Sequence, residues 1–203
     1  FFVIGFCMGV CNGFAIPVAQ RMGANEPAKM RRYVANAAWL SILFSLVLTA
    51  VTGLLCRRIL TVMLTPADIF DDAYAYIFVI FMGIPATFLY NLLAGVIRSL
   101  GDSKTPVYFL ALSSFLNIVL DLVLILHFQA GVAGAAVATV ASQGVSGLAC
   151  LLYMRKRFPI LRMTGEERRL DLHACGVLCA MGIPMGLQYS ITAIGSIILQ
   201  SSV

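Results

Sequence analysis

Six apolar segments, each about as long as a membrane-crossing helix, alternate with short polar connections along the chain. They are expected at residues 1–20, 34–56, 73–97, 106–127, 132–154 and 174–203. A helix needs about 20 apolar residues to cross the hydrocarbon core, and in lipid the backbone must satisfy its own hydrogen bonds. The pattern therefore predicts an all-α polytopic membrane protein.

The composition points to the same class. Hydrophobic residues make up 61% of the 203 residues and charged residues 11%, whereas a soluble domain carries roughly 25% charge. The excess apolar sequence needs lipid as its solvent. Because the chain opens at Phe1 and closes at Val203 inside apolar segments, we expect it to be a fragment of a longer protein.

Basic residues concentrate in alternate connections. Twelve of the 14 Lys and Arg residues fall at residues 21–32, 98–105 and 155–173, while two fall at 57–72 and none near Gln129. The positive-inside rule places the three basic connections in the cytoplasm and predicts a multi-pass protein of the plasma or inner membrane. Topology also explains the net charge of +5, so the expected partners are the lipid bilayer and a small-molecule substrate, not nucleic acid. We expect a monomer.

The connection at residues 57–72 leaves two alternatives open. Its apolar positions, which include Ile59 and Leu60, predict either a short amphipathic helix in the membrane interface or a plain connector. In both cases Pro66 and Asp68 predict a new helical start, with Asp68 in the first turn.

Small residues at four-residue spacing predict close contacts between helices. Gly5, Gly9 and Gly13 form a doubled motif in the first segment, and Gly131 and Gly134 pair with alanines in the fifth. Such positions let neighbouring backbones approach. Prolines also fall inside apolar segments, where each tends to kink a helix: they are Pro17, Pro85 and Pro184.

One ionisable side chain falls clearly inside an apolar segment. Asp121 lies four residues after Asn117, so both occupy one helix face, and Thr139 and Gln143 are one turn apart on the next segment. The short connection makes these segments antiparallel neighbours, and the rise of about 1.5 Å per residue brings Asn117 and Gln143 to matched depths of about 15–17 Å. We therefore predict that the four side chains form one polar cluster.

A carboxylate at that depth has two chemical uses. Burial favours its neutral form, so Asp121 can bind and release a proton. Beside the oxygens of Asn117 and Thr139 it can also hold a hard cation such as Na⁺. The alternative is a structural Asp121 bonded to Asn117 or to another helix. Asn91 and Gln143 are further candidates for lining a cavity.

No cofactor or other metal is expected. Cys7 and Cys11, like Cys175 and Cys179, have helical spacing, but no His stands beside either pair to complete a ligand set. The sequence shows no paired carboxylates and no nucleophile–base pair, so no enzymatic activity is expected.

Four stretches resemble the multidrug and toxic compound extrusion (MATE) transporters, in family order: residues 15–24, 98–106, 117–121 and 131–139. The resemblance implies helices two to six of a six-helix lobe at residues 1–154. It implies an interlobe linker at 155–173 and the truncated first helix of a second lobe at 174–203. It also implies a cation site that combines Asn117, Asp121 and Thr139 with an Asp on a first helix absent from this chain.

The resemblance further implies a secondary active transporter that exports cationic or amphipathic organic compounds in antiport with H⁺ or Na⁺. A flippase for lipid-linked saccharides in the same superfamily is the alternative. It is disfavoured because every Lys and Arg is expected in a connection and none inside a span. A membrane scaffold or receptor without transport is a third, weaker alternative.

Overall fold

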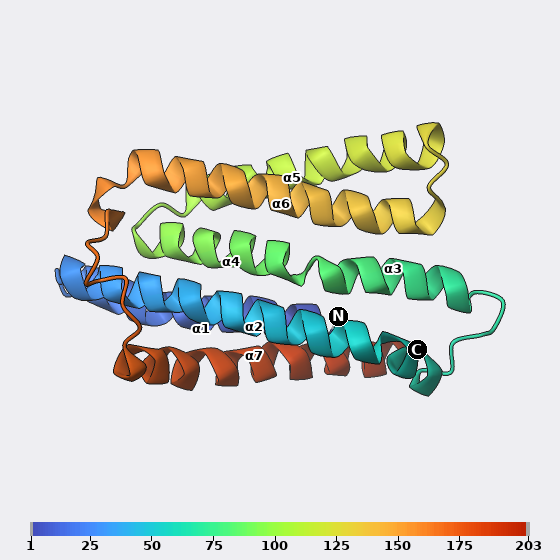
Figure 1. Cartoon of the computed structure of the whole chain (residues 1–203), viewed down its shortest axis with the longest axis horizontal. Helices are drawn as coiled ribbons and strands as arrows, with labels where there is room; N and C mark the ends of the chain where they lie inside the picture. The colour runs from blue at the N-terminus through green and yellow to red at the C-terminus, as the bar shows by residue number, and fades with distance from the viewer. Residues whose placement is uncertain (1, 202–203) are drawn as a thin grey trace.

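The structure, a computed structural model, describes residues 2–201 and consists of helices that run side by side in an elongated bundle (Figure 1). The α-helices are α1 (Phe2–Gly23), α2 (Pro27–Val62), α3 (Phe70–Met82), α4 (Ile84–Ser99), α5 (Lys104–Leu122), α6 (Gly131–Arg157) and α7 (Leu172–Ser201). A π-helix, Val123–His127, follows α5, and a 3-10 turn, Pro159–Leu161, follows α6.

Among the described residues, five helices are long and apolar enough to cross a membrane, and α3 with α4 makes a sixth if the pair is one span. Large apolar side chains stay exposed along α2 and α5, among them Leu54 and Phe115, as expected of faces that meet lipid. The predicted all-α polytopic membrane class is confirmed. Residue 1 of the first predicted span and residues 202–203 of the last lie outside the described residues.

The connections α1–α2, α4–α5 and α6–α7 gather at one end of the bundle, and α2–α3 and α5–α6 lie at the other (Figure 1). The first three are the connections that carry twelve of the 14 basic residues. We call this end, formed by residues 21–32, 98–105 and 155–173, the basic end. The helix order therefore sorts charge between the two ends, which is the arrangement that the positive-inside rule requires.

The second helix is longer than its apolar pattern predicted. α2 starts at Pro27, where a proline costs no hydrogen bond, and continues to Val62. Ile59 and Leu60 therefore belong to the last turns of α2, and the prediction of a separate amphipathic helix is wrong. The predicted start around Asp68 is also wrong, because α3 begins at Phe70 and carries Asp71 and Asp72 in its first turn.

The third predicted span, 73–97, is two helices and not one. α3 and α4 meet at Gly83 with a bend of 43°. Pro85 lies in the first turn of α4, where its missing N–H and its ring are tolerated because no helical bond is required there. Pro17 and Pro184, in contrast, lie inside the continuous helices α1 and α7.

Glycines bring α1 and α7 into backbone contact. A Cβ atom on Gly9 would lie 2.5 Å from the carbonyl oxygen of Met185, and one on Gly13 would lie 2.5 Å from Cα of Gly182. Gly182 and Gly186 thus provide α7 with the same four-residue spacing that Gly9 and Gly13 provide on α1. The predicted glycine contact on the first span is confirmed, and its partner is α7.

The glycines at the start of α6 have two different roles. Gly134 packs closely, since a Cβ there would lie 2.9 Å from Cβ of Ala130 and 3.4 Å from Cβ of Leu124. Gly131, for which packing was predicted, has a φ of +60°, and a Cβ added to it would meet no atom of residues 2–201 within 4 Å. Its role is conformational, because the left-handed backbone region favours glycine.

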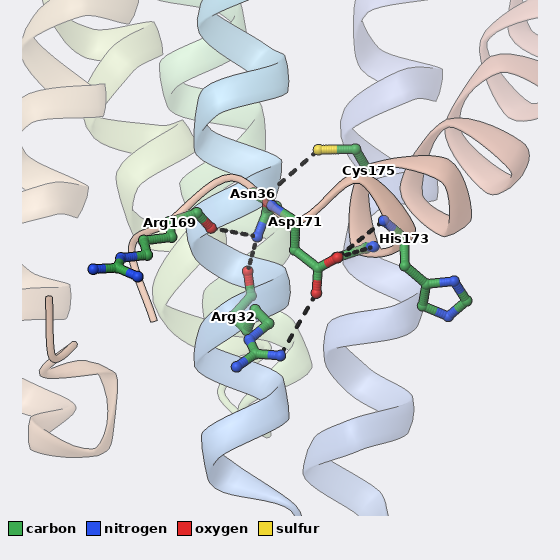
Figure 2. A network of polar contacts seen from close by, with 7 residues as sticks. Arg32, Asn36, Arg169, Asp171, His173 and Cys175 are labelled. Carbon is green, nitrogen blue, oxygen red and sulfur yellow. Dashed lines mark hydrogen bonds and ion pairs between the residues drawn. The ribbon is translucent and has the colours of Figure 1, made fainter. Parts of the chain in front are cut away.

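The connection from α6 to α7 is bound to α2. Glu167 forms an ion pair with Arg31 of α2, with 2.8 Å between Arg31 Nη2 and Glu167 Oε1, and both side chains are mostly buried. The fully buried Asn36 accepts a hydrogen bond from the backbone N–H of Asp171 at 2.9 Å (Figure 2). Asp171 in turn accepts from the backbone N–H of His173 and so begins α7. Residues 158–171 therefore form a fixed connection.

The contact between α1 and α7 predicts the effect of a single methyl group. Gly9→Ala in the full-length protein is expected to cost about 1–3 kcal/mol, because the new Cβ meets backbone atoms that cannot move aside. Gly176→Ala on α7 is the matched control, since its Cβ would meet no described atom within 4 Å. Thermal unfolding in detergent measures both. Equal melting temperatures for Gly9→Ala and Gly176→Ala would contradict the contact.

The Arg31–Glu167 pair predicts a pH dependence. Hydrogen bonds from the Arg31 guanidinium lower the pKa of Glu167 from its ordinary 4.5 to about 2. A lowered pKa in the folded protein stabilises above the unfolded value, so the contribution is present above pH 4.5 and is lost as the pH falls toward 2. The protection of the amides of residues 158–171, measured by hydrogen exchange and corrected for the intrinsic exchange rate at each pH, should therefore fall within that window.

Glu167→Gln should expose the same amides to exchange at neutral pH and should remove the dependence on acid. Glu166→Gln is the control, because Glu166 is exposed and belongs to none of the ion pairs found among residues 2–201. If Glu166→Gln and Glu167→Gln behaved alike, the ion pair would have no part in binding the connection.

Candidate functional site

Two of the predicted polar residues meet across the α5–α6 contact. The side-chain amide of Asn117 on α5 donates to Thr139 Oγ1 on α6 at 3.3 Å. The Thr139 hydroxyl donates in turn to the carbonyl oxygen of Ala135, one turn earlier on α6, at 3.0 Å. This leaves the carbonyl oxygen of the Asn117 side chain without a hydrogen bond among the described residues, so an acceptor remains at this contact.

Asp121 lies one turn beyond Asn117 on the same face of α5. Its Oδ1 atom is buried and has no hydrogen-bond partner within residues 2–201. The structural alternative was a bond from Asp121 to Asn117 or to another helix, and Oδ1 has neither among the described residues. A buried carboxylate oxygen without a donor is costly in a membrane, and a proton or a cation would relieve that cost.

The helix changes type directly after this carboxylate. α5 ends at Leu122, and Val123–His127 form a π-helix, in which Phe128 N–H bonds to the carbonyl oxygen of Val123. The predicted span 106–127 is therefore α-helical only in part. Single π-turns are uncommon and concentrate at functional sites, because the extra residue re-aims the side chains beside it. Here the neighbouring side chain is that of Asp121.

Gln143 does not belong to the predicted cluster and instead forms a hydrogen bond with α4. Thr87 Oγ1 donates to Gln143 Oε1 at 2.7 Å and also lies 3.4 Å from the carbonyl oxygen of Gly83. Thr87 and Gly83 lie at the bend between α3 and α4, so the position of the bend determines which side chain bonds to Gln143. The four polar residues therefore form two groups, one between α5 and α6 and the other between α6 and α4.

A cavity of about 270 Å³ opens between α1, α4, α5 and α6. Asn91 and Gln143 both line it, together with Tyr90, Ser103 and Ser113. Asn91 donates to the carbonyl oxygen of Thr87 at 2.8 Å, so its side-chain oxygen is available to the cavity. The lining combines apolar side chains with a few polar groups, as expected of a small-molecule site.

Arg98 is the one charged residue among the described residues that line this cavity. It belongs to the last turn of α4, which continues to Ser99. Its guanidinium donates to Asn12 Oδ1 on α1 at 3.0 Å, and Asn12 donates to the Tyr189 hydroxyl of α7 at 3.3 Å. Asn91, Ala94 and Arg98 have helical spacing, a pattern that could have revealed this face from sequence.

The stretch at residues 98–106 builds the turn between α4 and α5. Gly101 has a φ of +92°, a conformation that favours glycine. Asp102 accepts hydrogen bonds from the backbone N–H and the hydroxyl of Thr105 and from the hydroxyl of Tyr153 on α6. Ser99 donates to the carbonyl oxygen of Ala15 on α1. The turn thus holds α4, α5, α6 and α1 together at the basic end.

Comparison with known proteins identifies the relatives of this architecture. A probable multidrug resistance protein of Bacillus subtilis, YpnP, is 33% identical over 99% of the chain, and a second, YoeA, is 30% identical over the whole chain. The chain spans 45% of the length of each. It therefore covers about half of the curated relatives it matches.

Solved structures show the same fold. An outward-facing multidrug resistance MATE family transporter superimposes with a TM-score of 0.90 over 98% of the chain and 45% of that protein, at 24% identity. An inward-facing structure of such a transporter superimposes with a TM-score of 0.86 over 94% of the chain and 44% of that protein, at 24% identity. The family model described as MatE matches residues 1–123, more than half of the sequence. The chain therefore belongs to the MatE family.

Proposed function

We propose that the full-length protein is a secondary active efflux transporter that exports cationic or amphipathic organic compounds in antiport with H⁺ or Na⁺. Its family is a family of transporters, and the relatives named above are described as multidrug resistance proteins. Transporters of this kind work by alternating access around a central site. The chain supplies about half of such a protein, so the activity is assigned to the whole.

The observation that supports ion coupling is the buried Oδ1 of Asp121, which has no donor within the described residues. Asn117 and Thr139 lie one turn away and across the α5–α6 contact, and they bring further oxygen atoms to the same region. A proton needs only the carboxylate, whereas Na⁺ needs several oxygen ligands together. Both ions therefore remain candidates for this site.

The path from the ion to the cargo runs along α5. The same helix carries Asp121 and Asn117 at one end, and Leu110 and Ser113 on the wall of the cavity. A change of charge at Asp121 would alter how α5 packs against α6, and the cavity wall would move with the helix. Ion binding and cargo binding would then depend on each other, as antiport requires.

Asp121→Asn in the full-length protein tests the coupling. The amide has the shape of the carboxyl group but neither titrates nor carries charge, so the variant should fold and lose ion-driven efflux of a cationic dye. The measurement is dye efflux from proteoliposomes under an imposed ion gradient. Efflux at the normal rate from normally inserted protein would remove Asp121 from the mechanism.

Thr139→Ala tests whether Na⁺ or H⁺ drives transport. Asn117→Ala is a second variant of the same contact. If Na⁺ drives transport, both should require more Na⁺ for half-maximal efflux, because each variant removes an oxygen ligand. If H⁺ drives transport, both should keep the dependence on pH. Ser142→Ala is the control, since its buried hydroxyl bonds to the carbonyl oxygen of Thr139 on the same helix and forms no hydrogen bond to α5 among the described residues.

Arg98 favours a second candidate, the export of lipid-linked saccharides. The guanidinium is the only charge that the described residues place on the cavity wall, and it matches the phosphate of such a lipid by charge and by hydrogen-bonding geometry. Arg98→Gln should then weaken binding of a phosphate-bearing lipid by about tenfold or more and leave a cationic dye unaffected. Binding assays with the two ligands measure this, and Arg98→Lys should restore part of the affinity. An equal loss for both ligands would reject the second candidate.

A further inference from the structure

The segment at residues 168–172 is held in one shape at the basic end. The indole N–H of Trp39 on α2 donates to the carbonyl oxygen of Arg168 at 3.1 Å. The side-chain amide of Asn36, one turn earlier on α2, donates to the carbonyl oxygen of Arg169 at 3.5 Å. Because α2 binds these carbonyl groups, the backbone of the segment is fixed and its side chains are free to bind something else.

The two arginines of this segment have no acidic partner among the described residues. Both are exposed, and neither belongs to any of the ion pairs found within residues 2–201. Two of the three nearby carboxylates are already used, since Glu167 pairs with Arg31 and Asp171 with Arg32, and the third, the exposed Glu166, forms no ion pair with either arginine among the described residues. Figure 2 shows the Arg169 side chain directed away from Asn36 and Asp171 while its carbonyl group faces Asn36. The segment therefore presents uncompensated positive charge.

Apolar side chains stand directly beside this charge. Leu170 is 66% exposed and Leu172 is 87% exposed, so two large apolar side chains next to the arginines are left uncovered by the described residues. Trp39 is 49% exposed although its N–H is bonded. Arginines, exposed leucines and a tryptophan are the residue types that occupy the boundary between lipid headgroups and acyl chains. The basic end, where the segment lies, is the end that the positive-inside rule places at the cytoplasmic leaflet.

We propose that Arg168, Arg169, Leu170 and Leu172, together with Trp39, form a binding site for an acidic phospholipid of the cytoplasmic leaflet. The guanidinium groups bind the phosphate, and the leucines and the indole ring contact the glycerol and the first acyl carbons. A soluble polyanion would satisfy the arginines and leave both leucines in water. The charge and the exposed apolar surface together therefore favour a lipid.

The site lies where a bound lipid would act on the helix that follows. Asp171 accepts hydrogen bonds from the backbone N–H groups of His173 and Ala174, so the segment and the first turn of α7 move together. A lipid bound at 168–172 would hold the start of α7 at the membrane surface. This inference concerns a lipid and not the exported compound, so it stands independently of the proposed transport activity.

The experiment is a lipid titration of the purified full-length protein in neutral detergent, followed by native mass spectrometry. Phosphatidylglycerol is the acidic lipid and phosphatidylcholine the neutral reference. The double variant Arg168→Gln/Arg169→Gln should weaken phosphatidylglycerol binding roughly 25-fold, the effect of two cations beside an anionic headgroup, and should leave phosphatidylcholine binding unchanged. The protein's melting temperature without lipid confirms that the variant folds.

The matched control is Arg155→Gln/Lys156→Gln, a pair of exposed cations at the end of α6 on the same side. A site at 168–172 predicts a much smaller loss for this pair, whereas an equal loss would mean general attraction to negative charge and would overturn the site. Leu170→Ser/Leu172→Ser keeps every charge and should still weaken phosphatidylglycerol binding severalfold. Unchanged affinity in this variant, or displacement of the lipid by inorganic phosphate, would overturn the assignment to a lipid.

Discussion

Inside a bilayer no water is available to satisfy backbone N–H and C=O groups, and the rest of this structure depends on that constraint. It forces each apolar segment into a helix, and it also removes the usual hydrophobic force between helices, because lipid is as apolar as leucine. Helices must then associate through close packing. The contact of Gly9 and Gly13 on α1 with Gly182 and Gly186 on α7 meets this need, since backbones that touch at these positions gain dispersion energy.

The same constraint explains why the polar groups are few and why each has a definite place. Where the backbone breaks its regular pattern, a polar side chain stands nearby. The bend at Gly83 comes with Thr87 and Gln143, and the π-helix after α5 comes with Asp121. At both places irregular backbone and a polar side chain occur together. The cavity lies among α4, α6, α1 and α5.

At the basic end the constraint is relaxed, because water and headgroups are present. Connections there can use ion pairs and buried hydrogen bonds to fix their shape. Asn36 shows how: one fully buried amide accepts from Asp171 and donates to Arg169, and so it determines where α7 begins. The α6–α7 connection is therefore as well organised as the helices it joins, which allows it to present charged and apolar side chains in a definite arrangement.

The sequence by itself determined the solvent, the helical class, the order of the spans and the sorting of charge between the two ends. These follow from local composition, because the length of an apolar segment and the charge of a connection can be determined from that stretch of sequence alone. It also predicted that Asn117 and Thr139 would meet, because a short connection leaves antiparallel neighbours little freedom. Only the tertiary structure decided what depends on rotation and on partners distant in the chain. Gln143 bonds to Thr87, 56 residues away in sequence, because the bend between α3 and α4 brings that hydroxyl within reach. Arg98 lines a cavity because α4 extends to Ser99, and residues 168–172 are exposed as a fixed surface because α2 binds their backbone. The lengths of the helices, their bends and the partners of these side chains are set by packing between segments distant in the chain.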